Sequence, residues 1–257
     1  MVSVVARAKE VKQPLGGYLR LNQFDIRFYE DNKELFIKEN ISPSLVGLVV
    51  DYMSRFLLSE SAEDKLDAFK IPLLGSTIIG DKIRALSLFK SIKGSDDKSI
   101  ISAVKLVGYD VIYRAGVQFY KPVTDINPSK ETIKNIKIMI DRSLVFIKEY
   151  GPITKHGFTF EKKGYTSIVD KGDGDFLTES VLWDFKVSKY EPRKESTLQI
   201  LMYYLMGKRS IHTEFQSIEQ LGLFNPRLNK VYLIKVSDIP KETILEVEQS
   251  VIGFKSK

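Results

Sequence analysis

The chain has 257 residues, with 39 Lys and Arg against 33 Asp and Glu, two His and no Cys. The absence of Cys excludes disulfides, thiolate zinc sites and Cys-ligated iron–sulfur clusters, so we expect no iron–sulfur cluster. The two histidines, His156 and His212, are far apart in the sequence, which argues against a His-rich metal centre. Any metal site must then use oxygen ligands, which suit Mg²⁺, Mn²⁺ or Ca²⁺.

A hydrophobic fraction of 43% is enough for one large domain or two small ones. The net charge of +6 is compatible with nucleic-acid binding, although an ordinary basic protein would have the same charge. The longest apolar runs, such as Leu45–Val50, are too short to span a bilayer. The first residues carry the charged Arg7 and Lys9 and are not followed by the apolar stretch of a signal peptide. We therefore expect a cytoplasmic protein without membrane association, and the oligomeric state stays open.

Residues 1–43 form a mixed, turn-rich N-terminal segment in which 21–29 could be a strand. Ser42 is a suitable N-cap and Pro43 suits the first helical position, so an amphipathic helix is expected over 44–59.

Residues 60–155 are expected to be mostly helical, and the pattern changes to strands at residue 157. Helices are predicted at 79–92, 97–114, 129–150, 196–206 and 241–252. Strands are predicted at 158–160, 165–169, 176–178, 181–187 and 230–236. This order indicates an α/β layer fold with a helical insertion.

The densest polar segment, 172–186, can form a hairpin with Glu179 and Ser180 as a two-residue turn. In this register Asp175 and Asp184 are direct cross-strand neighbours, about 5 Å apart at Cβ. Lys186 lies two residues beyond Asp184 and therefore points to the same face. A three-residue loop would shift the register and remove this arrangement.

Two neighbouring carboxylates repel each other, and a divalent cation relieves the repulsion by taking both as ligands. A nearby ammonium group can then orient a water molecule and stabilise charge that develops on a phosphate. The alternative is a strand whose exposed face happens to carry Asp and Lys.

Gln199 and Tyr203 lie four residues apart on the next helix and so share one of its faces. Each has a simpler explanation. Ser196-x-x-Gln199 matches a capping box, and Tyr203 could be a half-buried core aromatic residue.

An Asp on one strand, Asp-x-Lys on the next and a helix with Gln-x-x-x-Tyr resemble the PD-(D/E)XK nuclease superfamily, and more narrowly its RecB-like branch. The resemblance implies an α/β, restriction-endonuclease-like core in which helices flank a mixed β-sheet. It also implies a single nuclease domain over 1–257, with a first-motif helix at 44–59, a long helical insertion at 60–155 and the nuclease core at 156–257.

By this resemblance, Asp51, Asp175 and Asp184 bind Mg²⁺ or Mn²⁺, joined by the main-chain carbonyl of Phe185. Lys186 positions or activates the attacking water. Asp51 follows Gly47 at the spacing of the first motif.

Gln199 and Tyr203 would contact DNA or brace the site. Glu149 and Glu161 compete with Asp51 for the role of the first-motif acid. The candidate phosphate contacts are the basic residues near the motifs in sequence, namely Lys155, Lys162, Lys163, Lys189, Arg193 and Lys194.

The expected function is a metal-dependent DNA nuclease that hydrolyses phosphodiester bonds with a metal-activated water. A separate protein partner would supply any helicase or targeting function. Two alternatives stay open. The first is a catalytically silent nuclease fold that binds DNA or a partner in a phage or mobile-element conflict system. The second is a helical interaction protein whose function lies in 60–155.

Overall fold

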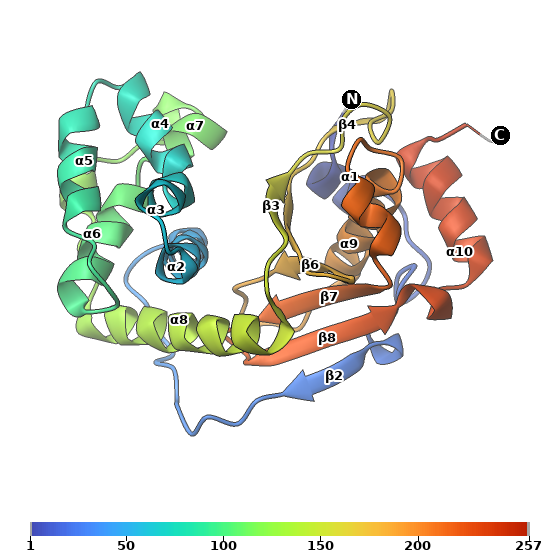
Figure 1. The fold of residues 1–257 in the computed structure, drawn as a ribbon, viewed down its shortest axis with the longest axis horizontal. Coiled ribbons are helices and arrows are strands. Elements are labelled where there is room, and N and C mark those ends of the chain that lie inside the picture. The colour runs from blue at the N-terminus through green and yellow to red at the C-terminus, as the bar shows by residue number, and fades with distance from the viewer. Residues whose placement is uncertain (1, 256–257) are drawn as a thin grey trace. The chain divides into compact units, whose positions relative to one another are not determined.

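The computed structural model describes residues 2–255. The chain divides into two compact units, and Figure 1 draws both. Residues 1–29 and 147–257 form what we call the sheet unit, and residues 30–146 form the helical unit. The helical unit is therefore inserted between two sequence segments that fold together. Within the described residues, no helix is both long and apolar enough to cross a membrane.

A six-stranded mixed sheet forms the centre of the sheet unit, in the order β2-β8-β7-β6-β5-β3. Its strands are β2 (Asp25–Phe28), β3 (Lys155–Phe158), β5 (Gly174–Leu177), β6 (Val181–Phe185), β7 (Gln220–Asn225) and β8 (Lys230–Lys235). Strands β6 and β7 are parallel, and the other neighbours are antiparallel. The short strands β1 (Val2–Ser3) and β4 (Val169–Lys171) form a separate parallel pair.

The helices α1 (Val4–Glu10), α9 (Lys194–Gly207) and α10 (Lys241–Glu246) lie on one face of this sheet (Figure 1). A π-helical turn, Val247–Ile252, continues α10. Helix α9 is buried from Thr197 to Gly207, since the core surrounds it. Short 3₁₀ turns cover Leu21–Gln23, Thr213–Ser217 and Val236–Asp238.

The helical unit contains α2 to α7 and most of α8, and the division between the units falls within α8. The bounds are α2 (Pro43–Leu58), α3 (Ala62–Ala68), α4 (Lys70–Ile78), α5 (Lys82–Lys90), α6 (Asp97–Val107), α7 (Asp110–Arg114) and α8 (Lys130–Tyr150), with 3₁₀ turns at Val117–Phe119 and Val123–Asp125. Helix α2 begins as predicted, because the Ser42 side chain accepts a hydrogen bond from the Leu45 N–H and Pro43 occupies the first turn.

The expected α/β class, with a mixed sheet flanked by helices, is confirmed. Several predicted elements were wrong. Helix α1 lies in the segment expected to be turn-rich, and 97–114 is two helices, because α6 ends at Val107. Only Val169 of the predicted strand 165–169 is in β4.

Strand β7 was missed because Gly222 weakens the strand pattern at its centre. Gly222 is nevertheless needed there. A Cβ at this position would lie 2.3 Å from Trp183 Cε3, so the glycine makes room for the indole.

Candidate functional site

The hairpin between β5 and β6 has the predicted register. Phe176 pairs with Trp183, and Leu177 pairs with Leu182. The N–H of Thr178 donates to the carbonyl of Val181 at 3.0 Å, which leaves Glu179 and Ser180 as the two-residue turn. Continuing this register places Asp175 opposite Asp184.

Alternation along β6 separates its side chains between two environments. Leu182 and Asp184 face the core beneath α9, whereas Trp183 faces the other side of the sheet. Trp183 is fully buried, donates from Nε1 to Thr178 Oγ1 at 3.1 Å and packs against Tyr150. Trp183 is thus a packing residue behind the hairpin, and it stabilises the register that brings the carboxylates together.

The Asp184 side chain is almost completely buried, with 1% of the residue exposed. Its Oδ1 accepts a hydrogen bond from Gln199 Nε2 at 3.2 Å. Its Oδ2 lies 2.9 Å from Lys186 Nζ as an ion pair that lacks hydrogen-bond geometry, and no other described residue donates to that oxygen. The buried Oδ2 of Asp184 therefore has an ion-pair partner but no hydrogen bond.

Asp175 is half-buried and reaches across the hairpin. Its Oδ2 accepts a hydrogen bond of 2.6 Å from the main-chain N–H of Phe185. This contact lies between Asp184 and Lys186 in sequence, so it holds the end of β6 against β5 at the site.

Gln199 connects the Asp-x-Lys strand to α9 through both the oxygen and the nitrogen of its side-chain amide. Its Oε1 accepts from Lys186 Nζ at 3.2 Å, and its Nε2 donates to both Asp184 and the Tyr203 hydroxyl, the latter at 3.0 Å. The capping-box alternative is wrong, because α9 begins at Lys194 and Ser196 already lies within the helix. Gln199 therefore serves the carboxylate site rather than the helix end.

The electrostatics of the site follow from burial and from the two adjacent negative charges. Burial raises the pKa of the Asp184 carboxyl, and the ammonium of Lys186 opposes that shift. Burial alone would lower the pKa of Lys186, but the carboxylates of Asp184 and Asp175 outweigh burial and raise it. Lys186 is therefore a charged ammonium at neutral pH.

Tyr203 responds to the same charges. Burial first, and then the carboxylates of Asp184 and Asp175, raise the pKa of its phenol. The carboxylate of Asp173, which lies between β4 and β5, adds to this effect. Tyr203 also stacks on Phe160 with ring centroids 5.2 Å apart, which holds the phenol in a fixed position.

Asp51, Asp175 and Asp184 are not all in one unit. Asp51 belongs to the helical unit, where both of its oxygens face the Arg55 guanidinium at 2.8 and 3.3 Å. Glu149 and Glu161, its competitors, belong to the sheet unit. Glu149 accepts from the Tyr29 hydroxyl at 2.8 Å, and Glu161 lies in a turn beyond β3 rather than on the strand.

Five of the predicted DNA contacts are exposed side chains of the sheet unit: Lys162, Lys163, Lys189, Arg193 and Lys194. Lys155 is instead paired with Glu214 at 2.7 Å. Arg193 is the N-cap of α9, so it lies near the start of the helix that carries Gln199.

The donor set of the hairpin fits a hard divalent cation. Mg²⁺ commonly binds to one or two carboxylates and keeps water or phosphate oxygens in its other positions. Asp175 and Asp184 supply that pair, and the partly satisfied Oδ2 of Asp184 supplies an oxygen with capacity for a further partner. Among residues 2–255 there is no group of three or more His, Cys, Asp or Glu side chains that could hold a metal ion.

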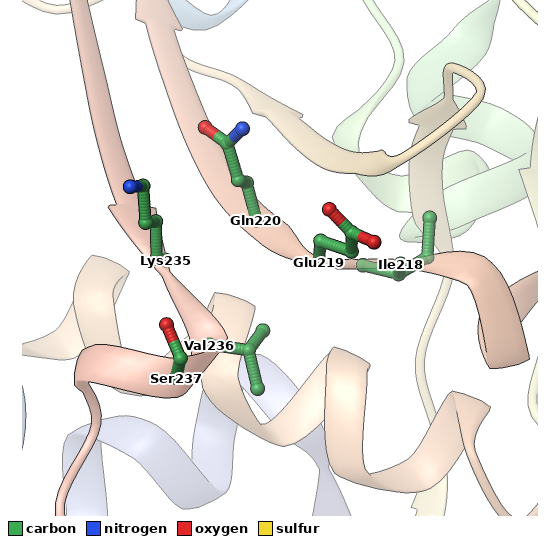
Figure 2. Close-up of a pocket in the computed structure, with 6 residues that line it drawn as sticks. All are labelled: Ile218, Glu219, Gln220, Lys235, Val236 and Ser237. Carbon is green, nitrogen blue, oxygen red and sulfur yellow. The ribbon is translucent and has the colours of Figure 1, made fainter.

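A separate hollow of about 360 Å³ lies where β7 begins and β8 ends. Figure 2 shows its six lining residues, Ile218, Glu219, Gln220, Lys235, Val236 and Ser237. None of the predicted site residues contributes to it. Gln220 pairs with Val181 at the turn end of β6, so the hollow and Asp184 are at different levels of the sheet.

Comparison of the chain with protein-family models, curated proteins and solved structures finds no match.

Proposed function

We propose that this chain is a Mg²⁺- or Mn²⁺-dependent DNA nuclease of the PD-(D/E)XK type. The observation that supports this most directly is the juxtaposition of Asp175, Asp184 and Lys186, joined to α9 through Gln199. Burial of one carboxylate beside another lowers the stability of the fold, so stability alone does not account for this pair. The arrangement is instead suited to binding a cation and a phosphate together.

Each residue has a distinct role in this proposal. Asp175 and Asp184 would hold the cation, and the main-chain carbonyl of Phe185 would be a further oxygen ligand. When bound, the cation supplies Lewis-acid activation of water and phosphate. Lys186 keeps its proton and orients the attacking water or stabilises charge on the phosphate, while Gln199 holds the Lys186 amine at 3.2 Å.

The topology is compatible with the proposed core. A hairpin, a covering helix and a strand parallel to the second hairpin strand follow one another as β5, β6, α9 and β7. In this proposal residues 60–155 are the helical insertion of the RecB-like branch, and Asp51, on the helix before the insertion, is the first-motif acid, with Glu149 and Glu161 as competitors. DNA is the substrate, and a helicase or targeting partner would be a separate protein.

The test is a cleavage assay with purified full-length protein on linear duplex, circular and single-stranded DNA. We expect cleavage with Mg²⁺ or Mn²⁺, none with chelator, and a loss of at least 100-fold in Lys186→Ala because a positioned catalytic group is removed. The matched control is Lys235→Ala, which removes an exposed lysine at the end of β8 and should cleave as the wild type does.

Folded wild-type protein that binds DNA but does not cleave it with either metal would contradict the nuclease proposal. That result would favour the non-cleaving DNA-binding alternative. The absence of both DNA binding and cleavage would instead favour a function carried by the helical unit.

A further inference from the structure

The loop from Val187 to Arg193 connects the Asp-x-Lys strand to α9 and is anchored on both sides. Asn225 holds its first part, because its Nδ2 donates to the Ser188 carbonyl at 2.8 Å and its Oδ1 accepts from the Ser188 N–H at 3.4 Å. Ser188 in turn accepts a hydrogen bond from the Tyr190 N–H at 3.0 Å. The loop is therefore held against the end of β7.

The second anchor is Glu191. Its carboxylate accepts hydrogen bonds from the Tyr232 hydroxyl and from Lys230 Nζ, both on β8. Tyr232 pairs with Leu223, and Leu223 pairs with Asp184. The anchor thus attaches the loop to the same face of the sheet that carries the carboxylates.

Between the two anchors, Tyr190 projects into solvent with 67% of its surface exposed. The Arg193 guanidinium lies over its ring, 5.6 Å from the centroid. An exposed aromatic residue on a pinned loop loses little conformational entropy on binding, and its free ring face can stack. The packing of the core does not need this ring, because most of it contacts water.

The surroundings of Tyr190 are positively charged and close to the site. Lys189 and Lys194 flank it in sequence and are exposed. Tyr190 is four residues from Lys186, so the chain keeps the two Cα atoms within about 14 Å. That distance spans no more than about four nucleotides at a stacked rise of 3.4 Å.

We propose that Tyr190, capped by Arg193, is a stacking platform for an unpaired base of the DNA strand that reaches the Asp175–Asp184–Lys186 site. Aromatic side chains in a basic groove bind single strands by base stacking without reading sequence, whereas duplex bases offer no free face. This inference rests on the proposed function for the identity of the strand. It adds that the strand is unpaired beside the site.

The test measures binding without cleavage. Fluorescence anisotropy of a labelled 12-nucleotide single strand and of the matching duplex is recorded in EDTA with the full-length chain. We expect Tyr190→Ala to weaken single-strand binding about tenfold, the loss of one stacked base, and to change duplex binding less than twofold. Tyr190→Phe keeps the ring and should bind as the wild type does.

Two controls separate stacking from damage to the fold. Tyr113→Ala removes another exposed tyrosine, 52% exposed, from the helical unit and should leave both affinities unchanged. A series of single strands with one abasic position leaves the protein intact. One position should weaken wild-type binding about tenfold and have no further effect in Tyr190→Ala.

Equal single-strand affinity in Tyr190→Ala and wild type would overturn the platform. So would equal losses on single strand and duplex, or no abasic position that matters. A failed cleavage assay with an intact stacking signal would instead remove the nuclease proposal and leave the platform standing.

Discussion

Asp184 is the residue at which stability and proposed chemistry oppose each other most directly. It is buried beside a second carboxylate, and a single ammonium from Lys186 faces both. Burial of a charge is unfavourable unless it is paired, and neighbouring like charges add repulsion. The site is therefore less stable in its empty form than an uncharged equivalent would be, and cation binding should remove that deficit.

This gives a prediction for Asp175→Asn. In EDTA at pH 7.5, the free energy of unfolding should rise by about 0.5–1 kcal/mol, because one of two like charges is removed while the acceptor for the Phe185 N–H is kept. Millimolar Mn²⁺ should stabilise the wild type and leave the variant unchanged. Urea titrations followed by Trp183 fluorescence measure both effects, and equal Mn²⁺ responses in the two proteins would exclude Asp175 as a ligand.

At the scale of elements, the hairpin depends on how β6 packs against β7. Trp183 occupies the space over Gly222 and is bonded to Thr178, so the packing on the far face of the sheet determines the register on the site face. Trp183, Gly222 and Thr178 therefore hold the carboxylates in register without having a role in the proposed chemistry. We therefore expect a change on the far face of the sheet to disturb the site.

Gly222→Ala should lower the free energy of unfolding by about 1–3 kcal/mol, because its Cβ would overlap the Trp183 ring. Gly94→Ala is the matched control, since nothing lies within 4 Å of its new Cβ, and it should change stability by less than about 0.5 kcal/mol. Urea unfolding followed by far-UV circular dichroism compares the two. Equal stability of both variants would show that the sheet shifts to accommodate the methyl group.

The first residues of the helical unit are attached to α8 by an ion pair. Arg142 donates from Nε and Nη2 to the two oxygens of Asp31 at 2.7 and 2.9 Å, and the guanidinium is buried. These bonds to Arg142 lower the pKa of Asp31, with the Lys33 N–H adding to the effect and burial opposing it.

A lowered pKa in the folded state stabilises the protein at pH values above the unfolded pKa near 3.9 and is lost as the pH falls below it. Asp31→Asn should therefore cost about 1–2 kcal/mol at pH 7 and progressively less from pH 4 to pH 2.5. Thermal unfolding of wild type and variant across this range measures the difference. A difference that stays constant with pH would show that Asp31 acts through packing alone.

At the scale of the whole molecule, the charge is unevenly divided. The sheet unit carries 22 Lys and Arg against 17 Asp and Glu, a net +5, whereas the helical unit carries 17 against 16, a net +1. The positive excess therefore belongs to the unit that contains the carboxylate pair. Phosphate binding should follow the same division.

Combined substitution of Lys189, Arg193 and Lys194 by Gln should reduce the slope of log affinity against log salt for single-stranded DNA by about 2, because up to three phosphate contacts are lost. The control replaces the exposed Lys90, Lys93 and Lys98 of the helical unit by Gln and should leave the slope unchanged. Anisotropy titrations in EDTA at several salt concentrations give both slopes. A larger effect of the control set would place the DNA on the helical unit.

Local sequence patterns correctly predicted those elements that depend only on residues close to them in the sequence. The N-cap at Ser42 and the turn at Glu179-Ser180 depend only on neighbouring residues, and both are present. Strand β7 and the true start of α9 were not predicted. Gly222 is needed for a contact with Trp183, which is far from it in the sequence. Ser196 is a typical capping residue, but it lies inside a helix that begins two residues earlier.

The sequence by itself predicted the hairpin register on the condition of a two-residue turn at Glu179-Ser180, because the side-chain period of two then leaves one way to pair β5 with β6. The tertiary structure decided that the turn has two residues. The sequence also predicted that any metal site uses oxygen ligands, because there is no Cys and the two His are far apart in the sequence. Only the tertiary structure decided that Gln199 bonds Lys186, Asp184 and Tyr203, and that Tyr190 is exposed beside Arg193. These contacts join separate elements, and their geometry depends on packing that no local pattern contains.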